Sequence, residues 1–101
     1  AIGYDAGGDG GSAALTGGGN TLIGNSAGAV IQGAAHSNTF IGGLAGNVTT
    51  TGVENTTLGY NTDIQDSTAT NQIVIGNNLT GTKDNAVFIG NDTSHIENDF
   101  N

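Results

Sequence analysis

The chain has 101 residues, 19 of them glycine, and a net charge of −8 with a single basic residue, Lys83. Nucleic-acid binding depends on Lys and Arg contacts to phosphate, and an anionic membrane surface repels a chain of this charge, so neither partner is predicted. The apolar runs are only a few residues long, which excludes insertion into a membrane. The length suits one domain, and the many glycines contribute so little apolar surface that its core is expected to be thin.

One short phrase recurs along the chain: an Asn, a run of mostly apolar residues and a closing Gly. The five copies are residues 20–24, 38–42, 55–59, 71–76 and 85–90, and residues 1–3 form a shortened copy. The closing glycines are 21, 18, 17, 17 and 14 residues apart. Each copy predicts a short strand, because Ile, Val, Phe and Thr favour extended backbone and Gly ends the run. A repeat of this length predicts an all-β solenoid, whose coils pack only on their neighbours.

The segments between these strands follow a weaker pattern. A second strand is expected after each closing Gly, at residues 27–31, 44–48, 61–64 and 78–80. We expect the Asn at the start of each phrase to stack on the next one as a side-chain amide ladder that bonds backbone groups in the turns. No helix is predicted, since no segment shows an apolar period of 3.6 residues.

The repeat pattern ends near residue 90. Acidic residues interrupt the last segment, at Asp92, Glu97 and Asp99. Residues 1–90 are therefore predicted to form the β-roll repeats. Residues 91–101 are predicted to form an exit segment towards a neck or stem in a longer protein.

Two columns of large apolar residues run through the predicted strands. One occupies the position before each closing Gly and consists of Ile23, Ile41, Leu58, Ile75 and Ile89. The other lies one residue earlier and consists of Leu22, Phe40, Val74 and Phe88, with Thr57 as the exception. Adjacent strand residues point to opposite faces, and a thin coil has only one interior. We assign the first column to the subunit core and the second to an interface with another copy of the chain; a monomer covered by a further segment is the alternative.

Residues that could carry chemistry are few. Asp63 and Asp66 have the types of an acid/base pair but lie in a polar loop, and the chain has no Cys, so no catalytic residues and no cofactor are predicted. Residues 5–11 hold one imperfect copy of a calcium-binding repeat, and His36 and His95 have no Cys nearby, so no metal site is predicted.

The residue types also bear on two surface functions, glycan contact and ice binding. Tyr4 and Tyr60 are the aromatic residues suited to glycan contact, although either could be packed, and no ligand-binding residues are assigned. Runs of Thr at residues 49–51 and 56–57 suggest ice binding, but ordered Thr arrays need the same position in every coil, and one strand position holds mostly Leu, Phe and Val.

Part of the chain resembles a known group of proteins. The sequences Asn-Thr-Phe-Ile-Gly-Gly-Leu-Ala-Gly-Asn at residues 38–47, Thr-Thr-Thr-Gly at 49–52 and Asn-Thr-Thr-Leu-Gly-Tyr-Asn at 55–61 resemble the head repeats of trimeric autotransporter adhesins. They resemble still more the equivalent repeats of phage and viral tail-fibre or spike proteins. Residues 89–100 are similar to segments that precede an endosialidase-type chaperone domain in such fibres. The resemblance covers roughly residues 20–100 and implies a left-handed parallel β-roll with three chains packed about an axis.

The function expected from the repeat and the resemblance is mechanical. The chain is expected to be a non-enzymatic module of a homotrimeric fibre or spike on the virion surface. It would attach to a host-cell glycan or protein, or support a receptor-binding tip. The first alternative is the head of a bacterial trimeric autotransporter adhesin, on the bacterial cell surface. The second is a monomeric β-solenoid that binds a ligand or ice.

Overall fold

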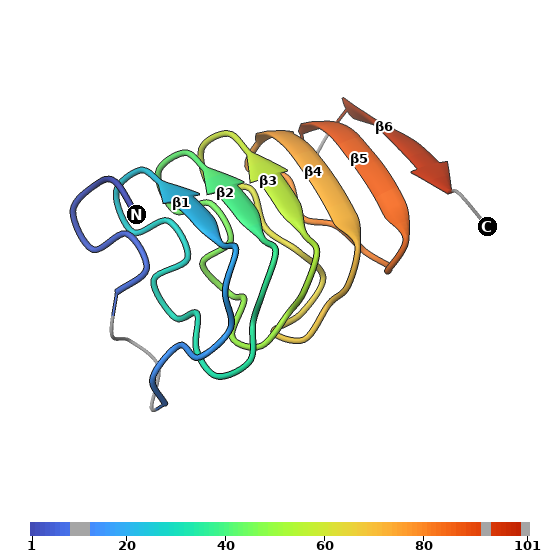
Figure 1. Ribbon diagram of the computed structural model, residues 1–101. Helices are drawn as coiled ribbons and strands as arrows, with labels where there is room; N and C mark the ends of the chain where they lie inside the picture. The colour runs from blue at the N-terminus through green and yellow to red at the C-terminus, as the bar shows by residue number, and fades with distance from the viewer. Residues whose placement is uncertain (9–12, 92–93, 100–101) are drawn as a thin grey trace.

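The computed structural model describes residues 1–8, 13–91 and 94–99 and shows one sheet whose strands follow chain order (Figure 1). The strands are β1 (Thr21–Ile23), β2 (Thr39–Ile41), β3 (Thr56–Leu58), β4 (Gln72–Asn77), β5 (Ala86–Asn91) and β6 (Ser94–Asp99). Neighbouring strands from β1 to β5 are parallel, and the chain makes one coil between each strand and the next. The predicted all-β solenoid is therefore confirmed.

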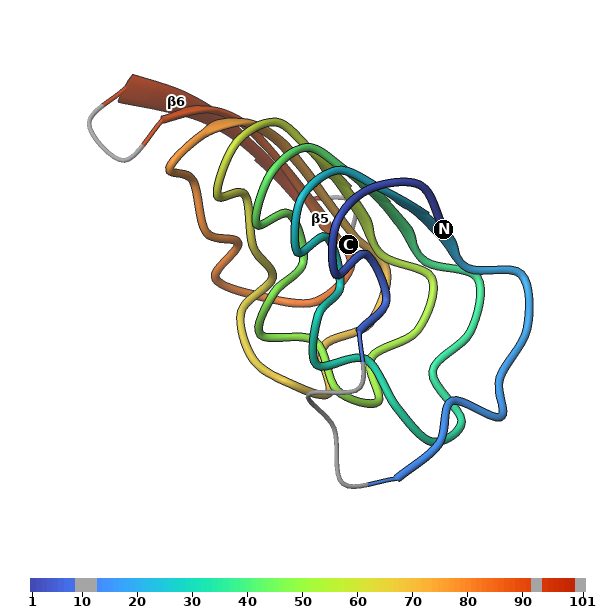
Figure 2. The same cartoon turned by 90° about the vertical axis from the view of Figure 1, so that its left-hand side faces the viewer.

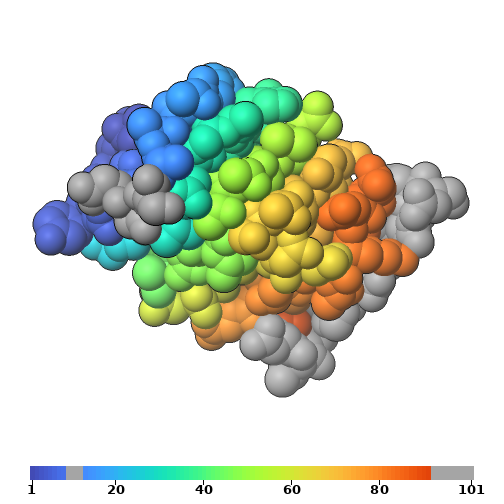
Figure 3. All heavy atoms as spheres, turned by 90° about the horizontal axis from the view of Figure 1, so that it is seen from below, coloured from blue at the N-terminus to red at the C-terminus, as the bar shows by residue number. Residues whose placement is uncertain are grey.

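The strand register reproduces the spacing of the repeated phrase. Thr21 pairs with Thr39, Thr39 with Thr56, Thr56 with Ile73 and Ile73 with Val87. Ile2 forms a bridge with Ile23, so the shortened copy at the start adds a further coil. Viewed along the axis, the coils follow one another beneath the strands and spread apart on the far side (Figure 2). From below, they form successive diagonal bands (Figure 3). Differences in repeat length are thus absorbed by the loops, away from the sheet.

The column assigned to the core and the column assigned to an interface are exchanged in the structure. Leu22, Phe40, Val74 and Phe88 are buried inside the solenoid, each no more than 4% exposed, together with Thr57. Ile23, Ile41, Leu58, Ile75 and Ile89 point outward and are half-buried or exposed. The alternation of the strands is as predicted, but alternation alone does not say on which side the coil closes. That side is set by the turn after each strand.

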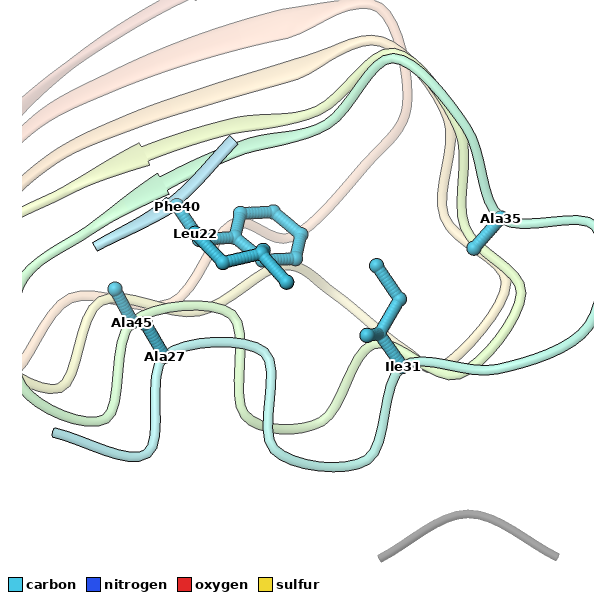
Figure 4. Packing of buried hydrophobic residues seen from close by; sticks show 6 residues of the cluster. All are labelled: Leu22, Ala27, Ile31, Ala35, Phe40 and Ala45. Carbon is cyan, nitrogen blue, oxygen red and sulfur yellow. The ribbon is translucent and has the colours of Figure 1, made fainter. Parts of the chain in front are cut away.

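The interior is thin and is filled from both sides. Leu22 and Phe40 point from β1 and β2 into the solenoid, toward Ile31 on the opposite wall (Figure 4). Ala27, Ala35 and Ala45 complete this cluster, and their small side chains leave room for the Phe40 ring. A second cluster, of Val74, Leu79, Ala86 and Phe88, lies at β4 and β5, with Val74, Ala86 and Phe88 on the strands and Leu79 just after β4. Side chains from the strands and from the segments between them therefore fill the interior together.

The predicted second strands are not formed. Residues 26–30 and 44–48 are turns, and residues 61–64 and 78–80 contribute only a bridge between Asp63 and Thr80. The cause is a repeated left-handed residue, at Ser26, Leu44, Asn61 and Asn78, with φ between 51° and 60°. A residue in this conformation bends the chain, so it cannot continue as a strand.

The amide ladder is present in the first three copies. The backbone N and Nδ2 of Asn38 both donate to Oδ1 of Asn20, at 3.1 and 3.0 Å. Asn55 makes the same two bonds to Oδ1 of Asn38, at 3.0 and 3.2 Å, and the backbone N of Gln72 donates to Oδ1 of Asn55. Each Asn also donates through Nδ2 to a loop carbonyl of its own coil; the pairs are Asn20 with Ala35, Asn38 with Gly52 and Asn55 with Ala69. The ladder thus ties each coil to itself and to the next.

The last two copies depart from the expected ladder. Thr56 pairs with Ile73, so the residue aligned with Asn55 is Gln72, and Asn71 lies one position earlier. Asn71 and Asn85 are left-handed, with φ of 54° and 57°, and Nδ2 of Asn71 donates to Oδ1 of Asn85 on the surface. The prediction that both belong to the ladder was wrong, because these copies hold one extra residue before the strand. Asn suits the position they do occupy, since it tolerates this conformation.

The C-terminal segment ends the parallel register. β6 pairs antiparallel with β5, so the chain reverses after Asn91. The predicted break near residue 90 coincides with this reversal, whereas Asp92 lies outside the described residues. Because β6 occupies the hydrogen-bonding edge of β5, it prevents another strand from pairing there.

The closing glycines are required sterically, which gives a first testable prediction. Gly42 has φ of +134°, and a Cβ at this position would overlap the carbonyl of Gly59 in the next coil. We expect Gly42→Ala to lower the free energy of unfolding by about 3 kcal/mol or more, since backbone strain and overlap with backbone combine. Gly18→Ala is the control, because a Cβ there meets nothing within 4 Å. Chemical denaturation followed by circular dichroism measures both; equal stabilities would contradict the steric requirement.

A second prediction separates Asn residues inside the ladder from those outside it. Asn38→Gly leaves the buried backbone N of Asn55 and the carbonyl of Gly52 without their partner. We expect a loss of about 2–4 kcal/mol in the free energy of unfolding. Asn71→Gly makes the same chemical change at a left-handed surface position, where Gly is well accommodated, and should change stability by less than about 1 kcal/mol. A comparable loss in the two variants would show that the ladder is not the source of the effect.

Candidate interaction surface

The outward side of the parallel sheet carries a continuous column of aliphatic side chains. We call this column the apolar stripe; it consists of Ile2, Ile23, Ile41, Leu58, Ile75 and Ile89. Ile2 is 68% exposed, Leu58 43% and Ile89 40%, and the other members are half-buried by their neighbours. Adjacent strands lie about 4.8 Å apart, so the stripe extends about 24 Å along the solenoid. Apart from Ile2, these are the residues that were predicted from the sequence to form the subunit core.

A second column lies beside the stripe on the same face. It is formed two residues earlier in each strand by Thr21, Thr39, Thr56, Ile73 and Val87. None of the residues in β1 to β5 is charged, in a chain whose net charge is −8. The face is therefore uncharged, repetitive and rich in aliphatic groups, which is typical of a surface that meets another surface rather than water.

One feature of the sequence indicates which column faces outward. The outer column is uniform, because every member is Ile or Leu. The inner column contains Leu, Phe, Thr, Val and Phe, and its members differ in volume. An interior packed against loops of differing length needs side chains of differing size, whereas a flat repetitive surface does not. Size variation thus marks the interior, and alternation alone does not reveal it.

The two tyrosines are both on the surface. Tyr4 is 83% exposed and Tyr60 is 58% exposed, so neither belongs to the core. Each follows a closing Gly, in the turn that leads out of the sheet. This placement resolves the question of packing that the sequence left open.

Asp63 and Asp66 serve different parts of the chain. Oδ1 of Asp63 accepts from the backbone N of Val48 and of Ile64, at 3.2 and 3.3 Å, and the side chain is buried. Burial raises the pKa of Asp63 to about 6, although the two backbone hydrogen bonds oppose this rise. Asp66 is exposed, and Oδ1 accepts from the backbone N and Oγ1 of Thr68, which lowers the pKa of its carboxyl. The carboxyl of Asp63 thus links its own turn to the neighbouring coil, whereas that of Asp66 bonds within its own turn, and the two do not share a hydrogen-bond donor.

Residues that could hold a metal ion are not gathered in the described part of the chain. Within residues 1–8 and 13–91, no group of three or more His, Asp or Glu residues could hold a metal ion. Nδ1 of His36 lies 3.2 Å from Oγ of Ser37, and the glycine-rich motif at residues 5–11 lies partly outside the described residues. The same described residues contain no helix long and apolar enough to cross a membrane.

Comparison with known proteins found no matching family model, no matching curated protein and no matching solved structure. Function is therefore inferred from the surface itself.

The buried carboxyl of Asp63 predicts how stability depends on pH. Because the pKa in the folded chain, about 6, lies above the ordinary value of 3.8, folding favours the protonated form. The contribution of this group is complete below about pH 4 and is lost as the pH rises through 6. Asp63→Asn keeps an oxygen acceptor and removes the charge, so we expect its free energy of unfolding to exceed that of the native chain by about 2 kcal/mol at pH 8 and to equal it at pH 4.

Urea denaturation at the two pH values measures this difference. Asp66→Asn is the control, since that carboxyl is exposed and its pKa is lowered rather than raised. The control should show no gain at pH 8. A native chain more stable at pH 8 than Asp63→Asn would reverse the assignment.

Proposed function

We propose that this chain is a non-enzymatic module of a homo-oligomeric, most simply trimeric, fibre or spike, and that it attaches to a host-cell surface or supports a tip that does. The observation that carries the proposal is the apolar stripe. It leaves aliphatic side chains in water on a face without charge, and burying them would contribute about 25 cal/mol for each Å² removed from solvent.

A second copy of the chain is the partner that this face fits. The stripe repeats one type of side chain at a constant spacing, so two or three parallel copies present matching surfaces to one another. Negative charge elsewhere on the chain disfavours contact between copies, except along a face that carries none. An interface made in this way uses Ile23, Ile41, Leu58, Ile75 and Ile89, in place of the inner column first assigned to it.

The resemblance described above supplies the finer parts of the proposal. It favours three chains about an axis, a left-handed coil and a place on a virion surface. The head of a bacterial trimeric autotransporter adhesin remains the alternative with the same architecture. In either setting three copies of a weakly binding surface would act together, so that avidity replaces a deep pocket.

A monomeric ice-binding solenoid is the second candidate, and one observation favours it. Thr21, Thr39 and Thr56 form an outward column next to the apolar stripe, each two residues before an aliphatic side chain. Leu22 and Phe40, which argued against an ordered Thr array, point inward and do not interrupt it. The column covers three coils and then continues as Ile73 and Val87, so the ordered Thr array is short.

The mass of the chain in solution tests the proposal. Light scattering over a wide range of concentration is expected to give the mass of three chains for the native protein. Leu58→Asp places a charge in the stripe of every copy and should shift the mass to one chain. Leu15→Asp makes a similar change at a similarly exposed Leu, 39% against 43%, that does not belong to the stripe, and should leave the oligomer intact.

Three outcomes contradict the fibre proposal. A folded native monomer would remove it, and thermal hysteresis in that monomer, abolished by Thr39→Asp, would establish the ice-binding candidate. An oligomer that survives Leu58→Asp would move the interface to another face. An oligomer lost equally in Leu15→Asp would show that added charge, and not the stripe, controls assembly.

A further inference from the structure

Tyr4 and Tyr60 lie in one column along the edge of the solenoid. The backbone bonds of successive coils define this column: the carbonyl oxygens of Tyr4, Asn25, Gly43 and Tyr60 accept from the amides of Ser26, Leu44, Asn61 and Asn78 respectively, at 2.8 to 3.0 Å. The chain has only these two tyrosines, and they are distant in sequence. In the structure they lie three coils apart along one edge. At a strand spacing of about 4.8 Å, their backbones are separated by about 14 Å.

The ring of Tyr60 lies next to Gly43, the residue that precedes it in this column. A Cβ built on Gly43 would lie 3.4 Å from Cδ2 of Tyr60, which places the ring beside Gly43 and so along the edge. The ring is nonetheless 58% exposed, so much of its surface faces solvent. Between the two tyrosines the column holds only Asn25, which has a short side chain, and Gly43, which has none, so no bulky side chain separates the two rings. We call this edge, formed by Tyr4, Asn25, Gly43 and Tyr60, the tyrosine edge.

Uncharged hydrogen-bonding groups border the two rings. Oγ of Ser26 donates to Oδ1 of Asn25 at 3.3 Å, and Nδ2 of Asn61 donates to Oδ1 of Asn78 at 3.0 Å. These exposed or half-exposed amides and hydroxyls keep further donors and acceptors for a ligand. Among the residues of the edge and the turn column beside it, Asp5 alone is charged.

This combination fits the chemistry of sugar rings. A pyranose presents C–H groups on its faces, which stack on an aromatic ring, and hydroxyls around its rim, which bond to amides and hydroxyls. Tyrosine supplies a rigid amphipathic surface at small cost in conformational entropy. No cation lies on the edge to balance a carboxylate or sulfate, and a net charge of −8 repels one.

We infer that the tyrosine edge binds a neutral oligosaccharide chain, which lies along the solenoid axis with one sugar on Tyr4 and another on Tyr60. The inference deepens the attachment part of the proposed function and rests on it, but each chain carries the whole edge and does not need the oligomer to form it. The edge lies two residues after the apolar stripe along the chain, beyond the ends of the strands, and shares no residue with it.

Titration with defined sugars tests this inference. The probes are the neutral pentasaccharides of the cellulose, starch, mannan and chitin series, with a sulfated heparin pentasaccharide as the charged comparison. Because the chain has no Trp, its intrinsic fluorescence reports on Tyr4 and Tyr60 directly. We expect saturable binding of at least one neutral probe and none of the sulfated one. Calorimetry should show affinity reduced about tenfold in Tyr60→Ser and in Tyr4→Ser and unchanged in Leu15→Ser.

The possible failures are distinguishable. Absence of saturable binding to all four neutral probes overturns the inference, as does stronger binding of the sulfated one, or equal affinity in the native chain and both Tyr variants. None of these results alters the mass in solution, so the fibre proposal stands or fails separately. Conversely, a folded Leu58→Asp monomer is expected to bind the neutral probe with the affinity of a single native chain.

Discussion

The structure depends on one constraint: a coil only a few side chains thick must bond its inward backbone groups without water. The amide ladder of Asn20, Asn38 and Asn55 meets this constraint at the start of β1 to β4: Oδ1 of Asn20 and of Asn38 each accept two N–H groups from the next coil, and Oδ1 of Asn55 accepts the backbone N–H of Gln72. Buried backbone groups left without partners would each cost about 1–3 kcal/mol, comparable to what a buried aliphatic side chain contributes. The coils therefore stack in one register, and every column of side chains follows from that register.

That register explains why the two sides of the strands differ. Inside, Phe40 and Phe88 are accommodated because Ala27, Ala45 and Ala86 lie near them, so the inner column adapts to each loop. Outside, no loop imposes a size, and the same aliphatic type recurs in every coil. The resulting uniform stripe remains partly in water, which is the physical basis for proposing that a second copy covers it.

A few polar groups in the interior are costly to bury. Oγ1 of Thr49 and of Thr57 are buried without a hydrogen-bond partner among the described residues, and Asp63 is buried where Gly28 and Gly46 stand in earlier coils. The carboxyl of Asp63 accepts the amide N–H of Val48 in the neighbouring coil. All three positions lie near the middle of the solenoid, so the stacked coils tolerate a few costly buried polar groups there.

The sequence by itself determined the repeat, the strands β1 to β5, their spacing and the presence of two apolar columns, because closing glycines and runs of β-favouring residues are local properties of the chain. It also predicted second strands at residues 27–31, 44–48, 61–64 and 78–80 that do not form, and it did not predict β6. It also predicted the Asn ladder, but placed Asn71 and Asn85 in it, although the copies at residues 71–76 and 85–90 are one residue longer than the first three. Only the tertiary structure decided which column is inside. The direction in which the coil closes is set by residues with left-handed backbone, such as Ser26 and Leu44. L-residues other than Gly, Asn and Asp rarely adopt this conformation, and here it is held by backbone bonds to the neighbouring coil. The same closure places Tyr4 and Tyr60 on one edge. Because they are 56 residues apart in the sequence, the sequence alone does not indicate that they share this edge.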